Sequence, residues 1–177
     1  MHRDLKCFFD PKAGAVVEAT AHANRGGNNL LKNLTFGYKE AIYSINPKYK
    51  KIMDITTYNT VSAIDGMVDL ALILVPAGQT PRVLKECVAK GIKGVILENS
   101  GFAEVGAEGR PYRMNVFIAK NGKVSLWGPN CMGLIDARKQ YVFSFMMPSL
   151  WHGFLKSGDI SLIAQSGLLS AGFCSQS

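Results

Sequence analysis

Polar and glycine residues follow short apolar runs in this sequence, at the positions where strands of a sheet should end. Gly128–Gly133 (GPNCMG) follows one such run, and Ser100–Gly106 (SGFAEVG) follows another. In parallel α/β sheets, ligands bind beside the carboxyl ends of the strands. The two segments therefore predict a ligand site along that edge of a sheet.

A third loop, from Glu18 to Gly27, occupies the phosphate-binding position of a nucleotide-binding fold. Backbone amides at the start of the following helix would face an anion there. Thr20 offers a hydroxyl and Arg25 a positive charge. The strict Gly-x-Gly-x-x-Gly fingerprint is absent, which counts against NAD. An ordinary glycine-containing turn is an equal alternative.

The end of the second predicted strand carries Asn46-Pro47-Lys48. A NAD-binding chain usually places an acidic residue here to hold the ribose hydroxyls. A lysine instead suits a phosphate attached to the ribose, which both NADP and coenzyme A carry. The alternative is a solvated surface lysine, a common fate for this residue type.

Two further strand ends supply candidate contacts. Pro76 directly follows an apolar run, where it would shape the wall of a groove. Glu98, Asn99 and Ser100 offer polar groups at the next strand end. Turn formation alone also explains these residue types.

The chemistry of cysteine and histidine is limited here. The four cysteines form no Cys-x-x-Cys pair, and with three histidines they give no metal-ligand cluster. Cys131 has no histidine nearby in the sequence, so we interpret it as a small buried hydrophobe rather than a nucleophile. His22 is a candidate ligand contact or an ordinary loop histidine. Scattered, reduced thiols predict a cytoplasmic protein.

The charge and hydropathy exclude other partners. A net charge of +7 favours an anionic ligand, but the basic residues are spread along the chain without a nucleic-acid-binding motif. No apolar run approaches the ~20 residues of a membrane span. The first residues lack the apolar segment of a signal peptide. Neither nucleic acid nor a membrane is therefore expected as a partner.

Strand-like and helical patterns alternate along the 177 residues, which predicts βαβ units around a parallel sheet. One helix should begin with a capping hydroxyl at Thr80 and a proline at Pro81, and end at Gly91. A loop containing Gly26 and Gly27 should precede a helix that carries Leu30, Leu31 and Leu34 on one face. The predicted strands and extended pieces span residues 13–17, 41–45, 55–58, 70–75, 94–97, 123–127 and 141–145; helices are expected near 61–64 and 111–120.

These motifs, in this order, resemble the CoA-binding domain of ADP-forming acyl-CoA synthetases, relatives of the succinyl-CoA synthetase α subunit. The resemblance runs from about Phe9 to Phe173. It includes INPK at 45–48, VPA at 75–77, residues 100–109, GPNCMG at 128–133 and residues 161–168.

The resemblance implies a Rossmann-like fold and assigns site residues by position. Thr20, Ala21 and His22 fall in the family's first CoA loop. Lys48 matches its basic CoA contact, and residues 98–100 (Glu98, Asn99, Ser100) match its second CoA-binding segment. The adenine nucleotide end of CoA would lie across these strand ends, with the thiol arm reaching toward a second domain.

Two domains follow from this reading. Residues 1–150 form the CoA-binding Rossmann-like domain, and 151–177 form a connector and the truncated start of a second, flavodoxin-like α/β domain. Residues 159–164 should begin that domain as a strand, followed by a helix start at 165–168. Because a strand and part of a helix cannot bury their own apolar faces, the remainder of this domain should lie outside this chain.

In the family, acyl-CoA, ADP and phosphate are converted reversibly to acid, CoA and ATP. A phosphohistidine in the second domain carries the phosphoryl group, and the nucleotide with Mg²⁺ sits in an ATP-grasp module. His2, His22 and His152 lack the glycine-rich context of that histidine. We therefore expect this chain to bind CoA or acyl-CoA, to hold no catalytic residue or metal, and to depend on the second α/β and ATP-grasp domains or subunit.

Two alternative functions stay open at this point. A stand-alone CoA-binding or regulatory module would share the site without catalysis, and an NAD(P)-dependent redox domain is disfavoured by the missing glycine fingerprint. The chain could also form a homo-oligomer. One departure from the family concerns Glu18, where glycine is usual. Glutamate adds bulk and negative charge beside the phosphate position, so it would weaken CoA binding or redirect the loop.

Overall fold

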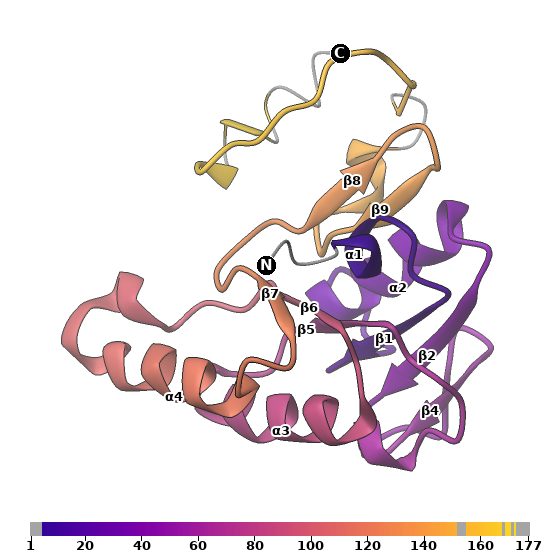
Figure 1. Cartoon of the computed structure of the whole chain (residues 1–177). Coiled ribbons are helices and arrows are strands. Elements are labelled where there is room, and N and C mark those ends of the chain that lie inside the picture. Colours follow the sequence, from indigo (N-terminus) through magenta and orange to yellow (C-terminus); the bar gives the residue numbers. More distant parts are fainter. Residues whose placement is uncertain (1–4, 152–154, 168, 171, 173–177) are drawn as a thin grey trace.

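The computed structural model describes residues 5–151, 155–167, 169–170 and 172. A seven-stranded sheet with the order β3-β4-β2-β1-β5-β6-β7 forms its centre (Figure 1). The neighbouring strands pair in parallel, apart from the antiparallel pair β3–β4. This confirms the predicted α/β, Rossmann-like class. The strands are β1 (Ala13–Val17), β2 (Ala41–Ile45), β3 (Lys51–Ile52), β4 (Ile55–Tyr58), β5 (Leu70–Ile73), β6 (Gly94–Leu97) and β7 (Ser125–Trp127).

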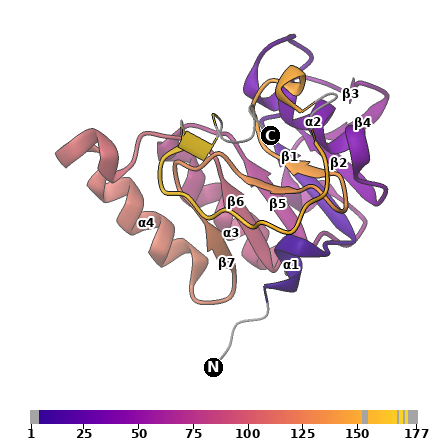
Figure 2. The same cartoon turned by 90° about the horizontal axis from the view of Figure 1, so that it is seen from above.

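Both faces of the sheet are covered, as parallel sheets require. Helices α3 (Thr80–Lys90) and α4 (Arg110–Lys120) cover one face (Figure 1). The other face is covered by α1 (Lys6–Phe9), α2 (Gly26–Gly37) and the antiparallel hairpin of β8 (Leu134–Asp136) and β9 (Tyr141–Phe143), as Figure 2 shows from above. Short 3₁₀ turns join these elements at η1 (Val61–Ala63), η2 (Ala77–Gln79), η3 (Ala103–Glu108) and η4 (Pro148–Leu150).

The core divides along the alternation of the strands, whose successive side chains point to opposite faces. Ala15 and Val17 of β1 belong to the apolar cluster that includes Val83 and Val116 of the two covering helices. Val16 belongs to the opposite cluster, with three leucines of α2 and with Leu134 and Phe143 of the hairpin. The hairpin is therefore an integral part of the second layer, a role that the sequence analysis did not predict.

Helix α3 begins and ends where predicted, but Thr80 has another role. Pro81 lies in its first turn, and Gly91 closes it with φ of 82° in the left-handed region. The Thr80 hydroxyl caps no helix amide; it donates to Pro76 O at 3.4 Å and accepts a hydrogen bond from Asn99 Nδ2 at 2.8 Å. The predicted capping role is wrong because η2 leads directly into the helix. Gln79, the last residue of η2, takes the N-cap position.

Helix α2 starts earlier than predicted, because Gly26 and Gly27 form its first turn rather than a loop. A Cβ on Gly27 would lie 2.2 Å from Glu18 O, so glycine allows the helix to approach the end of β1. Strand β5 ends at Ile73, two residues before the predicted end at Val75. The carbonyl of Val75 instead accepts a hydrogen bond from Asn99 Nδ2 at 2.6 Å.

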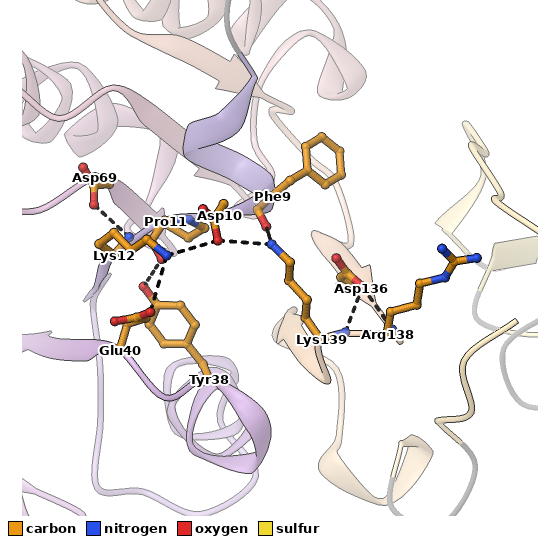
Figure 3. A network of polar contacts seen from close by, with 10 residues as sticks. All are labelled: Phe9, Asp10, Pro11, Lys12, Tyr38, Glu40, Asp69, Asp136, Arg138 and Lys139. Atoms are coloured by element: carbon orange, nitrogen blue, oxygen red, sulfur yellow. Dashed lines mark hydrogen bonds and ion pairs between the residues drawn. The ribbon is translucent and has the colours of Figure 1, made fainter. Parts of the chain in front are cut away.

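A polar network holds the turn of the β8–β9 hairpin beside the segment that precedes β1, at the edge of the sheet where the parallel strands begin (Figure 3). Lys139 Nζ, in the hairpin turn, lies 2.6 Å from Phe9 O and 3.2 Å from Asp10 Oδ1. Lys12 Nζ approaches the same carboxylate at 3.2 Å, and hydrogen bonds from both lysines lower the pKa of Asp10. Because these groups are exposed, each pair adds little to stability, but together they fix the hairpin turn beside α1.

The predicted strand at residues 159–164 is wrong, since these residues adopt no strand conformation. No described strand pairs with them, and a strand without a neighbour leaves its backbone hydrogen bonds unmade. Ile160 and Ile163 are 83% and 95% exposed. The segment contacts the hairpin through Arg138 Nη2, 3.0 Å from Asp159 Oδ1. Helical backbone begins at Gly167, close to the predicted start.

Candidate functional site

The candidate site lies along the carboxyl edge of the sheet. Strands β1, β2, β5, β6 and β7 are parallel, so the loops that follow them meet at this edge. The connection order reverses between β1 and β5, because β2 lies on one side of β1 and β5 on the other. Such a switch point is where open α/β sheets bind ligands.

The loop after β1 is braced from within the domain. Thr20 Oγ1 lies 3.2 Å from the Tyr49 hydroxyl and accepts the His22 backbone N–H at 3.2 Å. Asn28 Nδ2 donates to Thr20 O at 3.0 Å. Ala21, His22 and Arg25 remain exposed. Tyr49 and Asn28 brace the loop through contacts with residues distant along the chain, so no local sequence pattern indicates this role.

The amino end of α2 faces this loop. The N-cap residue Arg25 makes no side-chain cap, and the first turn contains no acidic residue. A helix of 12 residues carries a partial positive charge at this end. The loop and the helix start together offer a place for an anion.

Glu18 has φ of 72°, in the left-handed region that favours glycine. Its N–H donates to Ile45 O at 3.0 Å, which holds the backbone in this conformation. The side chain is exposed at the carboxyl edge. Glu18, where the resemblance led us to expect glycine, therefore occupies a backbone position that glycine favours.

We expect Glu18→Gly to raise the free energy of unfolding by about 1 kcal/mol, because it relieves the left-handed conformation of a residue with a Cβ. Glu18→Ala is the matched control: it removes the charge and retains the strain. Chemical denaturation of both variants checks this result. Equal stability of the alanine and glycine variants would contradict the role of the backbone.

Lys48 is held next to the first loop by a buried asparagine. Asn46 is 4% exposed; its Nδ2 donates to Ala19 O at 2.8 Å, and its Oδ1 accepts the Lys48 N–H at 3.0 Å. The Lys48 side chain itself is exposed. One side chain thus couples the loops after β1 and β2, and brings the predicted cation beside the predicted phosphate loop.

The end of β6 places its polar residues on alternate sides. Asn99 is buried, and its Nδ2 bridges Val75 O and Thr80 Oγ1, so it ties β6 to the start of α3. Glu98 is buried on the opposite side, beneath Gly133. Ser100 and Pro76 are exposed. The structure therefore brings the predicted residues to one edge but offers only part of them to a ligand: Thr20, Ala21, His22, Arg25, Lys48, Pro76 and Ser100 have accessible surface, and the side chains of Glu98 and Asn99 are enclosed.

A segment after β9, which we call the strap (Ser144–Met146), crosses the first turns of α2. Asn33 Nδ2 donates to Ser144 O at 2.7 Å and to Met146 O at 2.8 Å. Asn29 Nδ2 donates to Phe145 O at 3.2 Å. A Cβ on Gly26 would lie 3.5 Å from Phe145 Cβ and 3.7 Å from Leu74. The strap is thus fixed beside the switch point, next to the helix end that faces the phosphate loop.

Cys131 packs against the apolar cluster of the second layer, but it is only partly buried, where the sequence analysis expected a buried residue. Its Sγ donates to Leu97 O at 3.3 Å, and burial raises the pKa of the thiol to about 12. The thiol stays protonated near neutral pH, so it is a poor nucleophile. The described ranges contain no cluster of three or more His, Cys, Asp or Glu side chains that could hold a metal ion. Within the same ranges, no helix is long and apolar enough to cross a membrane.

Comparison with known proteins points to one family. A family profile with the description "CoA binding domain" matches residues 12–137. Acetate–CoA ligase [ADP-forming] II of Archaeoglobus fulgidus is 37% identical over 167 residues, which cover 93% of this chain and 24% of the relative. Acetate–CoA ligase [ADP-forming] II subunit alpha of Pyrococcus furiosus is 34% identical over 169 residues, which cover 95% of this chain and 36% of the relative.

A comparison with solved structures agrees with these sequence matches. A structure of the dinucleotide forming acetyl-coenzyme A synthetase 1 of Ca. Korarchaeum cryptofilum, in complex with phosphate and ADP, superposes with a TM-score of 0.86 at 30% identity. The match covers 98% of this chain and 36% of that one. The chain therefore spans between about a quarter and just over a third of the length of these relatives.

Proposed function

The chain belongs to the CoA-binding domain family, and from this premise we propose that it binds coenzyme A along the carboxyl edge of its sheet. The observation that carries the proposal is the coupling of two loops by Asn46. Asn46 links the Lys48 backbone to Ala19, in the loop of Thr20 that leads into the uncapped amino end of α2. A basic side chain and a helix amino end that follow neighbouring strands suit a ligand with separated phosphate groups.

Each group of accessible residues would contact a different part of CoA. Lys48 would bind the phosphate on the ribose, and the loop of Thr20, Ala21, His22 and Arg25 would hold the pyrophosphate. Pro76 and Ser100, on the other side of the switch point, would contact the remainder of the ligand. Asn99 supports this side through its hydrogen bonds to Val75 and Thr80.

In its biological context, the chain is proposed to be the CoA-binding portion of an ADP-forming acid–CoA ligase. The similarity to acetate–CoA ligases, which extends over 93% and 95% of this chain, supports this. The described chain lacks a histidine in a phosphoryl-carrying context, so phosphoryl transfer with ADP and Mg²⁺ would belong to further domains or subunits. The exposed isoleucines at 160 and 163 support a second domain that begins after residue 150.

We predict that Lys48→Ala weakens binding of CoA about tenfold and leaves binding of dephospho-CoA unchanged, because one charge-assisted contact to the ribose phosphate is lost. Lys50→Ala is the matched control, since Lys50 is an exposed lysine in the same loop. Calorimetric titration of both variants with both ligands measures the difference. An equal loss for CoA and dephospho-CoA would contradict the role given to Lys48.

A further inference from the structure

A buried carboxyl group at the candidate site has no partner. Glu98 is 4% exposed, and neither of its carboxyl oxygens has a hydrogen-bond partner in the described part of the chain. None of the ion pairs formed by the described residues includes it. A carboxylate without a partner is strongly disfavoured in such surroundings, whereas the neutral acid is tolerated.

Two segments lie over the Glu98 carboxyl group: the Gly128–Gly133 turn and the strap. We refer to them together as the cover. A Cβ on Gly133, at the end of the Gly128–Gly133 turn, would lie 2.7 Å from Glu98 Oε1 and 1.8 Å from Phe143 O. Gly133 has φ of 88°, so both its conformation and the lack of space require glycine. The strap begins directly after Phe143. The turn and the strap therefore close over the carboxyl group with no room for additional atoms at Gly133.

The surroundings contain little to compensate a charge. Burial raises the pKa of Glu98 well above its usual value. The backbone N–H of Phe145 lies close enough to lower this pKa in part, but it does not have the geometry of a hydrogen bond to either carboxyl oxygen. Cys131, in the overlying turn, is a titratable neighbour of Glu98. Its pKa is raised mainly by burial and, to a smaller extent, by the charge of Glu98. A negative charge on Glu98 would thus face a thiol that is itself held neutral.

We propose that Glu98 is a positioning residue, whose neutral carboxyl group allows the Gly128–Gly133 turn and the strap to close over the carboxyl edge of the sheet. When the carboxyl group ionises, the buried charge is stable only if water reaches it, so the cover opens more often. The strap contacts Gly26 at the amino end of α2, so its position shapes the place assigned to the CoA pyrophosphate. This last consequence rests on the proposed function, whereas the movement of the cover does not.

Cys131 provides a direct measure of the cover, since its thiol is hydrogen bonded to Leu97 O beneath the turn. We would measure the rate of alkylation of Cys131 by iodoacetamide in the free protein, resolved by peptide mass spectrometry, from pH 5.5 to 9. The matched control is Glu98→Gln, which keeps the size and remains neutral. The ratio of the two rates cancels the intrinsic pH dependence of thiol alkylation.

The ratio of wild type to Glu98→Gln should be near one at the acidic end. It should then rise, by up to tenfold per pH unit, once the pH exceeds the pKa of the buried group. Glu98→Met, an apolar side chain of similar length, should follow the glutamine variant. A ratio that stays within twofold across the range would overturn the proposal, and so would a parallel rise in the methionine variant.

The stability of the whole domain gives a second test. The pKa of Glu98 is higher in the folded state than in the unfolded state, so the folded state binds this proton more tightly. Its stabilising contribution is complete below the pKa of an unfolded glutamate and is lost as the pH rises through the pKa of the folded group. Urea denaturation should show this loss in the wild type and not in Glu98→Gln. An identical pH dependence in the two proteins would contradict it.

These experiments need no ligand, so they remain informative if CoA fails to bind. With CoA present, the affinity of the wild type relative to Glu98→Gln should fall over the pH range in which the alkylation ratio rises. If the cover responds to pH and neither protein binds CoA, the proposed function fails and the positioning role stands. If both bind CoA and the alkylation ratio is flat, the opposite holds.

Discussion

Gly27→Ala should lower the free energy of unfolding by about 2 to 3 kcal/mol, because the added methyl group overpacks a backbone contact. The new Cβ would lie 2.2 Å from Glu18 O and 3.1 Å from the Ala19 Cα. Neither neighbour is a flexible side chain, so α2 must move away from the end of β1. The displacement would also shift the helix end that faces the phosphate loop, and we expect CoA affinity to fall more than tenfold.

Gly26→Ala is the control within the same helical turn. Its Cβ would meet Phe145 Cβ at 3.5 Å, an ordinary contact. Alanine also favours helix more than glycine does, by up to about 1 kcal/mol. In thermal and urea denaturation, Gly26→Ala should therefore be at least as stable as the wild type, and Gly27→Ala should be less stable than the wild type. If both substitutions are equally tolerated, the close approach of α2 to β1 does not limit this site.

Asn33→Ala should be the second strongly destabilising change, with a loss of about 2 to 4 kcal/mol in the free energy of unfolding, because one buried and one part-buried hydrogen bond lose their donor. Asn33 is 1% exposed, and its amide group donates to Ser144 O and Met146 O. Without it, the strap loses its main attachment to α2. Hydrogen exchange of residues 141–147 should accelerate in this variant at every pH, in contrast to the pH-dependent loosening assigned to Glu98.

Asn29→Ala is the graded control, since Asn29 makes a single and longer bond to Phe145 O at 3.2 Å. Its loss should be about 1 kcal/mol, the usual worth of one such bond. Exchange rates along the strap that are unchanged in Asn33→Ala would show that the segment is held by other contacts.

The sheet could be predicted because its signals are local. Ala13–Val17, Ala41–Ile45 and Gly94–Leu97 are short apolar runs bounded by glycine, proline or polar residues, and the structure places strands at these residues. Gly91 ends α3 for the reason that the sequence suggests, since only glycine adopts the left-handed region without strain. These features depend on a few neighbouring residues.

The second layer could not be predicted in the same way, because it depends on contacts between distant segments. Asn33 and Ser144 are 111 residues apart in the sequence. Gly26 and Gly27 are typical of a loop, and only their fit against Glu18 and Phe145 explains why they form helix. The run at 159–164 has the pattern of a strand, but a strand exists only beside a partner.

For the candidate site, the sequence indicated the edge of the sheet at which these residues meet, and not which of their side chains face outward. Lys48 and the loop of Thr20 were identified by position, and Asn46 explains how they come together. The alternation at the end of β6 buries Glu98 and Asn99 on opposite sides, and a loop pattern gives no information about this. Strand register therefore decides which candidates can touch a ligand.

Calorimetric titration of the chain with CoA, dephospho-CoA, NADP and NAD tests the central claim most directly. We predict that CoA binds, that its affinity falls about tenfold without the 3′-phosphate, and that both nicotinamide cofactors bind more weakly. Glu18→Gly, measured in parallel, should bind CoA more tightly than the wild type. Tighter binding of NADP than of CoA, or no binding of CoA to either protein, would contradict the assignment of this edge as a CoA site.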